Sequence, residues 1–342
     1  NQRYNNLFKF LVDPAGLCRS GGDAIHGDFG VSGATNMTFR NCNAYRFDCH
    51  YEMMGFWHIY DCSFLSGHVC GGWGTFLMEN CVFPYDWNSG QSFPIDRRND
   101  LCMPYSGTIT FKNITMEGGG GVLNYTMSGY LDETTNTRPP LANIDKLNFK
   151  ETVVVLDNIV MGPKTARWNF MQVNDNLTWP DGTADEDRYE YHTTIIVKNT
   201  HFWRLPDELA PADESGSPQC VGWGRIKKYI FENCTGENYL TLDMQAMDVD
   251  FINCDFYNGF YFKGDQKMYG DLRVINCKLN DIGNIDNIGS YHKNIVLTGN
   301  MIKADSTFPT LLGSKFTHKI INNNTIIGDA NTHLSDWNGI FA

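Results

Sequence analysis

A short apolar segment that runs into a small polar turn recurs eleven times along this chain. Clear copies are Met37-Thr-Phe-Arg-Asn-Cys42, Phe76-Leu-Met-Glu-Asn-Cys81 and Ile230-Phe-Glu-Asn-Cys234. The separations between successive turn residues, counted along the sequence, are 20, 19, 33, 45, 41, 34, 20, 23, 23 and 24. The recurring separation of 20–24 residues indicates a solenoid, in which no single repeat buries its apolar face alone. We therefore interpret residues 1–342 as one repeat domain.

Two kinds of solenoid have a period in this range. A leucine-rich repeat needs Leu at fixed offsets and a helical return, whereas the apolar residues here are Val, Ile, Phe and Met in alternation, which favours strands. The turn residue is Asn or Asp, which tolerates left-handed backbone. The sequence therefore predicts an all-β, right-handed parallel β-helix of about 11–12 coils. Successive coils are expected to stack about 4.8 Å apart.

Stacking places equivalent residues of successive coils in columns. The polar turn residues are predicted to form a ladder of side-chain hydrogen bonds, and they are Asn41, Asp61, Asn80, Asn113, Asn158, Asn199, Asn233, Asn253 and Asn276. Six of the eleven cysteines follow directly after this column, namely Cys42, Cys62, Cys81, Cys234, Cys254 and Cys277. Parallel Cβ vectors at the coil spacing fit disulfide geometry poorly, so we expect these cysteines to be inward, unpaired thiols.

Four consecutive long intervals place extra segments after the turns, at 82–105, 117–145, 162–190 and 203–226. Because the coils stack, these segments are predicted to meet as one lateral outgrowth, and such insertions often form the binding face of a solenoid. They contain five of the eight tryptophans: Trp87, Trp168, Trp179, Trp203 and Trp223. Aromatic faces stack on sugar rings. The alternative is that these tryptophans fill a small core within the outgrowth.

The composition excludes several classes of function. A net charge of −12 without any basic run argues against binding to nucleic acid. No apolar run approaches the length of about 18 residues that marks a membrane-spanning helix, so no membrane insertion is predicted. No motif predicts a metal or a cofactor. An odd number of cysteines without Cys-x-x-Cys favours folding in a reducing cytosol. Since the chain begins at Asn1 and stops inside a further coil, we expect a longer protein around it.

The strongest candidate for chemistry is a column of charged residues that follows the insertions. Asp243 and Lys263 both lie ten residues after a turn, on neighbouring coils, and Asp265 follows two residues later. A carboxylate pair supports glycoside hydrolysis. A lysine beside an acid can instead serve as the base for β-elimination on a uronic acid. The alternative is a solvated column held by surface ion pairs.

Two secondary candidates lie nearer the N-terminus. Asp48, His50 and Glu52 occur together, with His68 one coil further on, and such groups suit acid–base work, although their spacing matches no known metal site. Arg97 and Arg98 in the first insertion are candidates for binding an anionic sugar. The alternative for this charged run is a loop that pairs its own charges.

The Phe-x-Asn-Cys turns and the short, regular period of the coils resemble the pectate-lyase-like β-helix superfamily across about residues 20–342. Within it, the free cysteines, acidic charge and lateral insertions are most similar to a bacteriophage tailspike. This resemblance implies a homotrimer on a virion, assembled in bacterial cytoplasm with other virion proteins, that binds or cleaves surface polysaccharide. The Asp-Asp pair expected of a polygalacturonase is absent after the coil turns.

Three functions are therefore predicted as alternatives. The first is a tailspike-like receptor-binding protein that recognises a host surface polysaccharide, with or without depolymerising it. The second is a non-catalytic structural or adhesive appendage of a virion. The third is a secreted polysaccharide lyase or glycoside hydrolase.

Overall fold

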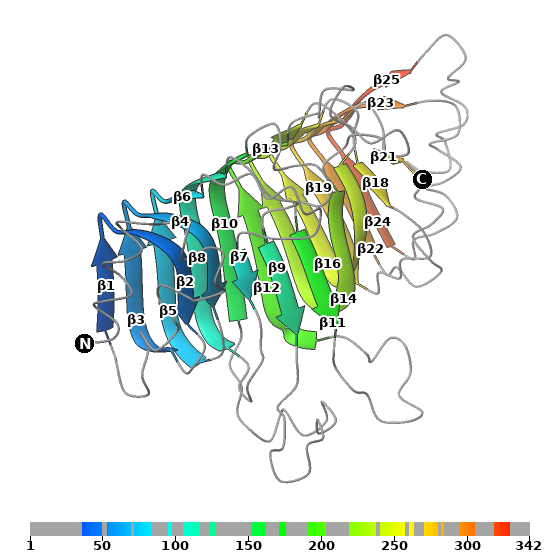
Figure 1. Cartoon of the computed structure of the whole chain (residues 1–342). Coiled ribbons are helices and arrows are strands. Elements are labelled where there is room, and N and C mark those ends of the chain that lie inside the picture. The colour runs from blue at the N-terminus through cyan, green and yellow to red at the C-terminus, as the bar shows by residue number, and fades with distance from the viewer. Residues whose placement is uncertain are drawn as a thin grey trace, which may run out of the picture.

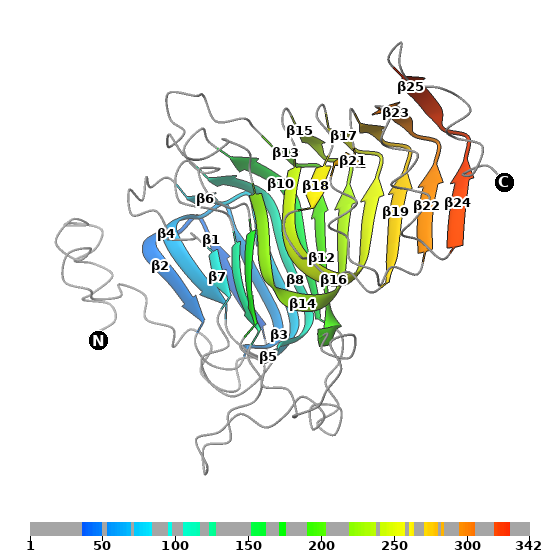
Figure 2. The same cartoon turned by 90° about the vertical axis from the view of Figure 1, so that its right-hand side faces the viewer.

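The structure, a computed structural model, describes residues 36–49, 53–69, 72–83, 95–97, 105–116, 123–127, 152–161, 171–175, 190–202, 219–236, 240–256, 260–262, 270–279, 282–283, 294–304 and 318–328. In this part of the chain, parallel strands from successive coils stack into extended sheets, as Figures 1 and 2 show. The arrangement confirms the predicted all-β parallel solenoid. Among these residues, no helix is long and apolar enough to cross a membrane.

The strands form one 19-stranded sheet and one 6-stranded sheet. Eleven strands of the larger sheet come one from each coil, and we call them the long sheet: β1 (Asn36–Arg40), β3 (Met53–Tyr60), β5 (Gly72–Glu79), β8 (Tyr105–Met116), β10 (Thr152–Met161), β12 (Glu190–Lys198), β14 (Gln219–Glu232), β16 (Leu240–Ile252), β19 (Asp271–Ile275), β22 (Asn294–Thr298) and β24 (His318–Asn322). The others in that sheet are β2 (Asn43–Cys49), β4 (Ser63–Val69), β6 (Val82–Phe83), β7 (Ile95–Arg97), β9 (Leu123–Met127), β11 (Met171–Asp175), β18 (Phe260–Phe262) and β21 (Ile282–Gly283). The 6-stranded sheet follows the turns and contains β13 (His201–Phe202), β15 (Thr235–Gly236), β17 (Asp255–Phe256), β20 (Lys278–Leu279), β23 (Met301–Ala304) and β25 (Thr325–Gly328).

Each long-sheet strand ends in a corner that needs left-handed backbone. The predicted Asn and Asp residues all have φ between 51° and 55°, as does Asn323, and Gly299 occupies the remaining corner with φ 70°. Asn and Asp tolerate this conformation better than other residues with a side chain. At Gly299 a Cβ atom would collide with Oδ1 of Asn276, so this corner has no room for a side chain.

The corner side chains form the predicted ladder, with one change of partner. Asn113 donates to Asn80 at 3.0 Å, Asn158 donates to Asn113 at 2.9 Å, and the bonding resumes at Asn199, which accepts from Asn233, and continues to Asn276. Asn199 instead donates to the carboxylate of Asp157 at 2.7 Å. The ladder therefore contacts a charged side chain in the middle of the stack.

The residue after each corner points inward, and its hydrogen bonds explain the choice of cysteine. All six predicted cysteines are free thiols, and five are buried while Cys42 is half-buried. The Cys277 thiol donates to the Ile275 carbonyl oxygen, and Cys277 Sγ accepts the amide N–H of Cys254 on the preceding coil. Thr200 bonds in the same way: its hydroxyl donates to the Lys198 carbonyl oxygen and accepts the amide N–H of Ile159 on the preceding coil. A small side chain that both donates and accepts therefore satisfies buried backbone groups here.

Much of the core comes from the alternate long-sheet residues that face inward. Trp57, Ile59 and Phe76 are fully buried, and Phe231 stacks on Phe251 of the next coil with ring centroids 5.1 Å apart. Because side chains alternate along a strand, the residues between these positions form the outer face of the long sheet.

Each of the four predicted insertion segments contributes a strand to the stack. Ile95–Arg97 pairs with Leu123–Met127, which pairs with Met171–Asp175, which pairs in turn with the start of β14. In each coil these residues lie between the turn and the next long-sheet strand, and we call this part of the coils the third side of the solenoid. The strands named here connect β4 to β16 along this side. Most of the rest of these segments lies outside the described residues, so a lateral outgrowth there stays a prediction.

Candidate functional site

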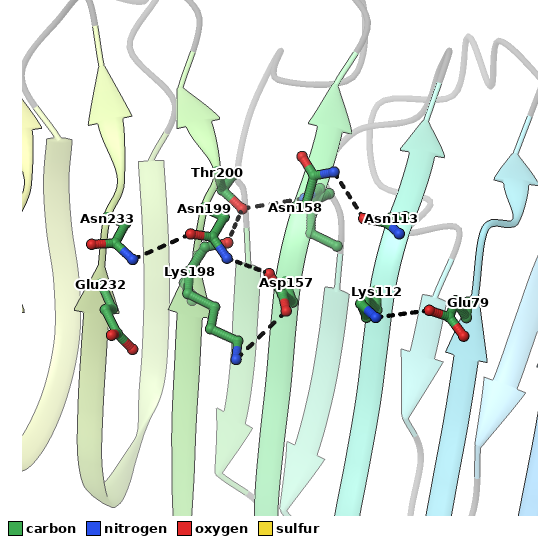
Figure 3. A network of polar contacts seen from close by, with 12 residues as sticks. Glu79, Lys112, Asn113, Asp157, Asn158, Lys198, Asn199, Thr200, Glu232 and Asn233 are labelled. Carbon is green, nitrogen blue, oxygen red and sulfur yellow. Dashed lines mark hydrogen bonds and ion pairs between the residues drawn. The ribbon is translucent and has the colours of Figure 1, made fainter.

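The outer face of the long sheet carries two different arrangements of charge. In the residue just before each corner, five successive coils alternate in sign, and we call this row the charge ladder: Glu79, Lys112, Asp157, Lys198 and Glu232. Lys112 Nζ lies 2.8 Å from Glu79 Oε1, and Lys198 Nζ lies 3.5 Å from Asp157 Oδ2 (Figure 3). The hydrogen bond from Lys112 lowers the pKa of the Glu79 carboxyl.

From the last of these coils onward, charges also lie further from the corner, and they form what we call the charge cluster: Lys228, Asp248, Asp250, Asp271 and Arg273. They come from the neighbouring strands β14, β16 and β19. Asp248 and Asp250 lie two residues apart on β16, so both face outward, while Val249 and Phe251 between and beside them are fully buried.

Asp250 is the centre of this cluster. One of its carboxylate oxygens lies 2.5 Å from Lys228 Nζ, and the other lies 3.1 Å from Arg273 Nε. The Arg273 N–H is not aligned for a hydrogen bond, so this second contact is an ion pair. Asp250 is only 5% exposed, and a buried carboxylate is stable only when it is paired. It therefore holds both cations in place.

The exposed part of the cluster is formed by Asp248 and Arg273. Their side chains are 31% and 35% exposed, and Arg273 Nη2 lies 3.7 Å from Asp248 Oδ2. Asp248 also accepts the backbone N–H of Asp271 at 2.8 Å, and Asn294 donates to the Asp271 carboxylate at 2.6 Å. A fixed acceptor and a fixed donor fork therefore stand side by side at the surface.

This arrangement suits a ligand rich in hydroxyl groups. A carboxylate accepts hydrogen bonds from hydroxyls, and a guanidinium donates up to five in a rigid geometry. Among the described residues, no group of His, Cys, Asp or Glu is arranged to hold a metal ion.

The backbone register connects two of the predicted clusters. Asp48 pairs with His68, which pairs with Asp96, and the same row continues through Asn124, Gln172 and Val221 to Asp243. The neighbouring row is apolar: Phe47, Gly67, Ile95, Leu123, Met171, Cys220, Leu242 and Phe262. Asp48 and Asp243, predicted as separate sites, thus belong to one mainly polar row on the third side of the solenoid.

Two of the remaining predicted residues belong to described strands. Trp223 lies in β14 and Arg97 in β7, where only the strand positions are described. Nine predicted residues lie outside the described residues: His50, Glu52, Trp87, Arg98, Trp168, Trp179, Trp203, Lys263 and Asp265. The proximity of Asp243, Lys263 and Asp265 stays a prediction.

The sequence interpretation missed the charge cluster, although a signal for it is present. Asp250 and Arg273 lie three residues before a corner, where neighbouring coils have Val155, Ile196 and Ile230. Charged residues in a column that is otherwise largely apolar mark a departure from what packing requires. Counting backward from each corner, as well as forward, would have found them.

Comparison with known proteins identifies no relative: no family model, no curated protein and no solved structure matches this chain.

Proposed function

We propose that this chain is the glycan-recognising β-helix of a tailspike-like receptor-binding protein, with the charge cluster as part of its binding surface. The observation that carries the proposal is the pairing of buried Asp250 with both Lys228 and Arg273. This pairing fixes the direction of a half-exposed guanidinium beside a half-exposed carboxylate. Sugars need such fixed donors and acceptors, because their hydroxyls otherwise stay bonded to water.

The fold supports an extended ligand. Successive coils repeat about every 4.8 Å along a flat stack of strands, so equivalent positions recur along the length of a polymer. The described cluster contains two cations and three carboxylates, which favours a glycan rich in neutral hydroxyls over a polyanion.

Binding is tested with a panel of purified capsular and O-antigen polysaccharides, using biolayer interferometry. We expect Asp248→Asn and Arg273→Lys to weaken binding to the recognised polysaccharide about tenfold or more, since each removes or reshapes a charged contact. Asn at 248 can still accept the Asp271 N–H, so the fold is preserved. The control is Lys278→Gln, whose side chain is 65% exposed on the 6-stranded sheet. Failure of every polysaccharide to bind, or equal binding by all variants, would overturn the proposal.

Cleavage is a separate property, and it is assigned to the predicted residues Asp243, Lys263 and Asp265. We expect Asp243→Asn to lose about 10²–10⁴ in turnover while binding survives, if the chain depolymerises its glycan. Reducing-end release reports hydrolysis, and absorbance at 235 nm reports elimination. Full activity in this variant would remove Asp243 from the catalytic role.

A further inference from the structure

One strand of the long sheet has an outer face made of rings. On β3, Phe56, His58 and Tyr60 alternate with the buried Trp57 and Ile59, so all three point outward. Phe56 and His58 meet edge to face with centroids 5.8 Å apart, and His58 and Tyr60 lie 4.6 Å apart. We call these three residues the aromatic strip. Among the outward positions that the structure describes on this sheet, the other strands have no comparable set.

The strip is not needed for the core. Phe56 is 39% exposed, and its register partners on the neighbouring strands are Asn36 and Thr75, both short and exposed. The ring of Phe56 therefore projects beyond the shorter side chains on both neighbouring strands. One face of Tyr60 is covered by the Arg40 guanidinium, 5.2 Å from its centroid, and the His58 ring packs against Tyr60. Phe56 is therefore the most open ring of the strip.

The charges around the strip balance one another. Arg40 lies 4.0 Å from Asp61, and Lys112 lies 2.8 Å from Glu79, whose other carboxylate oxygen lies 3.7 Å from His58 Nε2. The net charge of these two cations and two carboxylates is zero when His58 is neutral. A charged ligand would thus find no complementary excess charge, whereas hydroxyl groups would find both donors and acceptors.

We infer that the aromatic strip is a stacking subsite for a neutral pyranose, which lays its apolar C–H face on the exposed ring of Phe56, beside His58, and directs hydroxyls toward Glu79 and Arg40. Aromatic faces bind such C–H surfaces, and the polar rim supplies orientation. A second copy of the chain is a poorer occupant, because a stable dimer buries about 800 Å² on each partner, far more than three partly covered rings provide.

The inference deepens the proposed function, because it takes from it the ligand class and adds a second point of contact. Phe56 and Lys228 belong to the same row, which runs through Thr75, Thr108, Val153 and Thr194. Five coil steps of about 4.8 Å separate them, or about 24 Å. A single sugar cannot touch both places, so the two sites can be tested separately.

The test is saturation-transfer-difference NMR with methyl β-glucopyranoside and methyl β-galactopyranoside at millimolar concentration. We expect saturation of ring C–H protons of at least one glycoside, with affinity about tenfold lower in Phe56→Ala, as expected for uncovering roughly 50 Å² of apolar surface. Phe56→Trp should retain or strengthen binding. Val160→Ala is the matched control, since Val160 is a 47% exposed apolar residue on β10.

Equal saturation in Phe56→Ala and the parent protein, or no saturation by either glycoside, would overturn the inference. A change in sedimentation coefficient in Phe56→Ala would also overturn it, because it would show that a second copy occupies the strip. Lys278→Gln should leave glycoside binding unchanged. Loss of polysaccharide binding in Asp248→Asn with no effect of Phe56→Ala on the glycosides would refute only this inference. Weaker glycoside binding in Phe56→Ala with unchanged polysaccharide binding in Asp248→Asn would refute only the proposed function.

Discussion

The coils that carry insertions and the short coils that follow them use charge differently on the same face. Between Asn80 and Asn233, where successive turns are separated by 33 to 45 positions, the residue before each corner belongs to the charge ladder. Beyond Asn233 the separations shorten to between 20 and 24, and the same column holds Ile252, Ile275 and Thr298. There the charged residues lie in columns further from the corner, and together with Lys228 of the last ladder coil they form the charge cluster.

This difference has a physical reason. A long connection leaves the register of the next coil open, and a strand that slips along its neighbour moves its side chains away from their proper partners. An alternating ladder favours the native register, because each charge meets its opposite in the coil above and below. Short connections already restrict the register. The charges of the cluster are therefore more than folding requires, which is why we assign them to a ligand.

The largest loss of stability is expected in the column of residues directly after the corners, in the short-interval coils beyond Asn233. Asn300 is 2% exposed, accepts the Cys277 N–H at 2.8 Å, and donates to the Val274 carbonyl oxygen at 2.8 Å. Asn300→Leu leaves both groups unpaired, and we expect a loss of about 2–4 kcal/mol in urea unfolding. In the insertion region Ile159 holds the equivalent position directly after a corner. Ile159→Leu should lower the free energy of unfolding by less than about 1.5 kcal/mol. Equal losses would show that both regions rely on packing alone.

A smaller effect is expected from the corner backbone. Gly299→Ala forces a side chain into left-handed backbone against Asn276, and we expect a loss of about 1–3 kcal/mol. Asn113→Gly keeps the favourable backbone and removes only ladder hydrogen bonds at the surface, so its loss should stay near about 1 kcal/mol. Hydrogen exchange of peptides around each corner locates the change. A neutral Gly299→Ala would contradict the steric account.

Alkaline pH should affect the two regions unequally. The hydrogen bond with the Cys234 thiol, together with burial, raises the pKa of Cys254 to about 12 from an ordinary value of 9.0. A raised pKa in the folded state means that the stabilisation is complete below pH 9 and is lost as pH rises toward 12. The insertion region has Ile114, Ile159 and Thr200 in this column, which do not titrate. The hydrogen bond with the Cys254 thiol, together with burial, raises the pKa of Cys277 as well. Between pH 8 and pH 10.5, proteolytic cleavage should therefore increase first in the coils of Cys254 and Cys277, and the double variant Cys254→Ala with Cys277→Ala should remove that increase.

The smallest effect on stability is expected in the charge ladder. Lys198 and Asp157 are 34% and 14% exposed, and reversing Lys198 to Glu should cost below about 1 kcal/mol. Its effect should appear in refolding, where we expect a lower yield of native protein at low salt. The exchange Asp157→Lys with Lys198→Glu restores that pair but reverses the contacts with Lys112 and Glu232, so only partial recovery is expected. An unchanged yield in the single variant would refute the role in register.

The sequence predicted the corners well because the same backbone problem recurs in every coil. Left-handed φ selects Asn or Asp, and a buried amide beside it selects a small side chain with a hydrogen-bonding atom, so Asn-Cys repeats visibly. The strand Ile95–Arg97 was not predicted, since three residues show too little alternation to stand out within a long insertion. The charge cluster was missed because Lys228, Asp250 and Arg273 are adjacent only through the register of three strands.

The most direct measurement compares one ladder cation with one cluster cation in the same assay. Lys198→Gln and Arg273→Gln are each examined for polysaccharide binding and for urea unfolding. We predict that Arg273→Gln loses binding about tenfold or more while remaining folded, because Lys228 still pairs with Asp250. Lys198→Gln should bind as the parent protein does. Equal binding by both variants, or loss of binding in Lys198→Gln alone, would contradict the assignment of the ladder to folding and the cluster to a ligand.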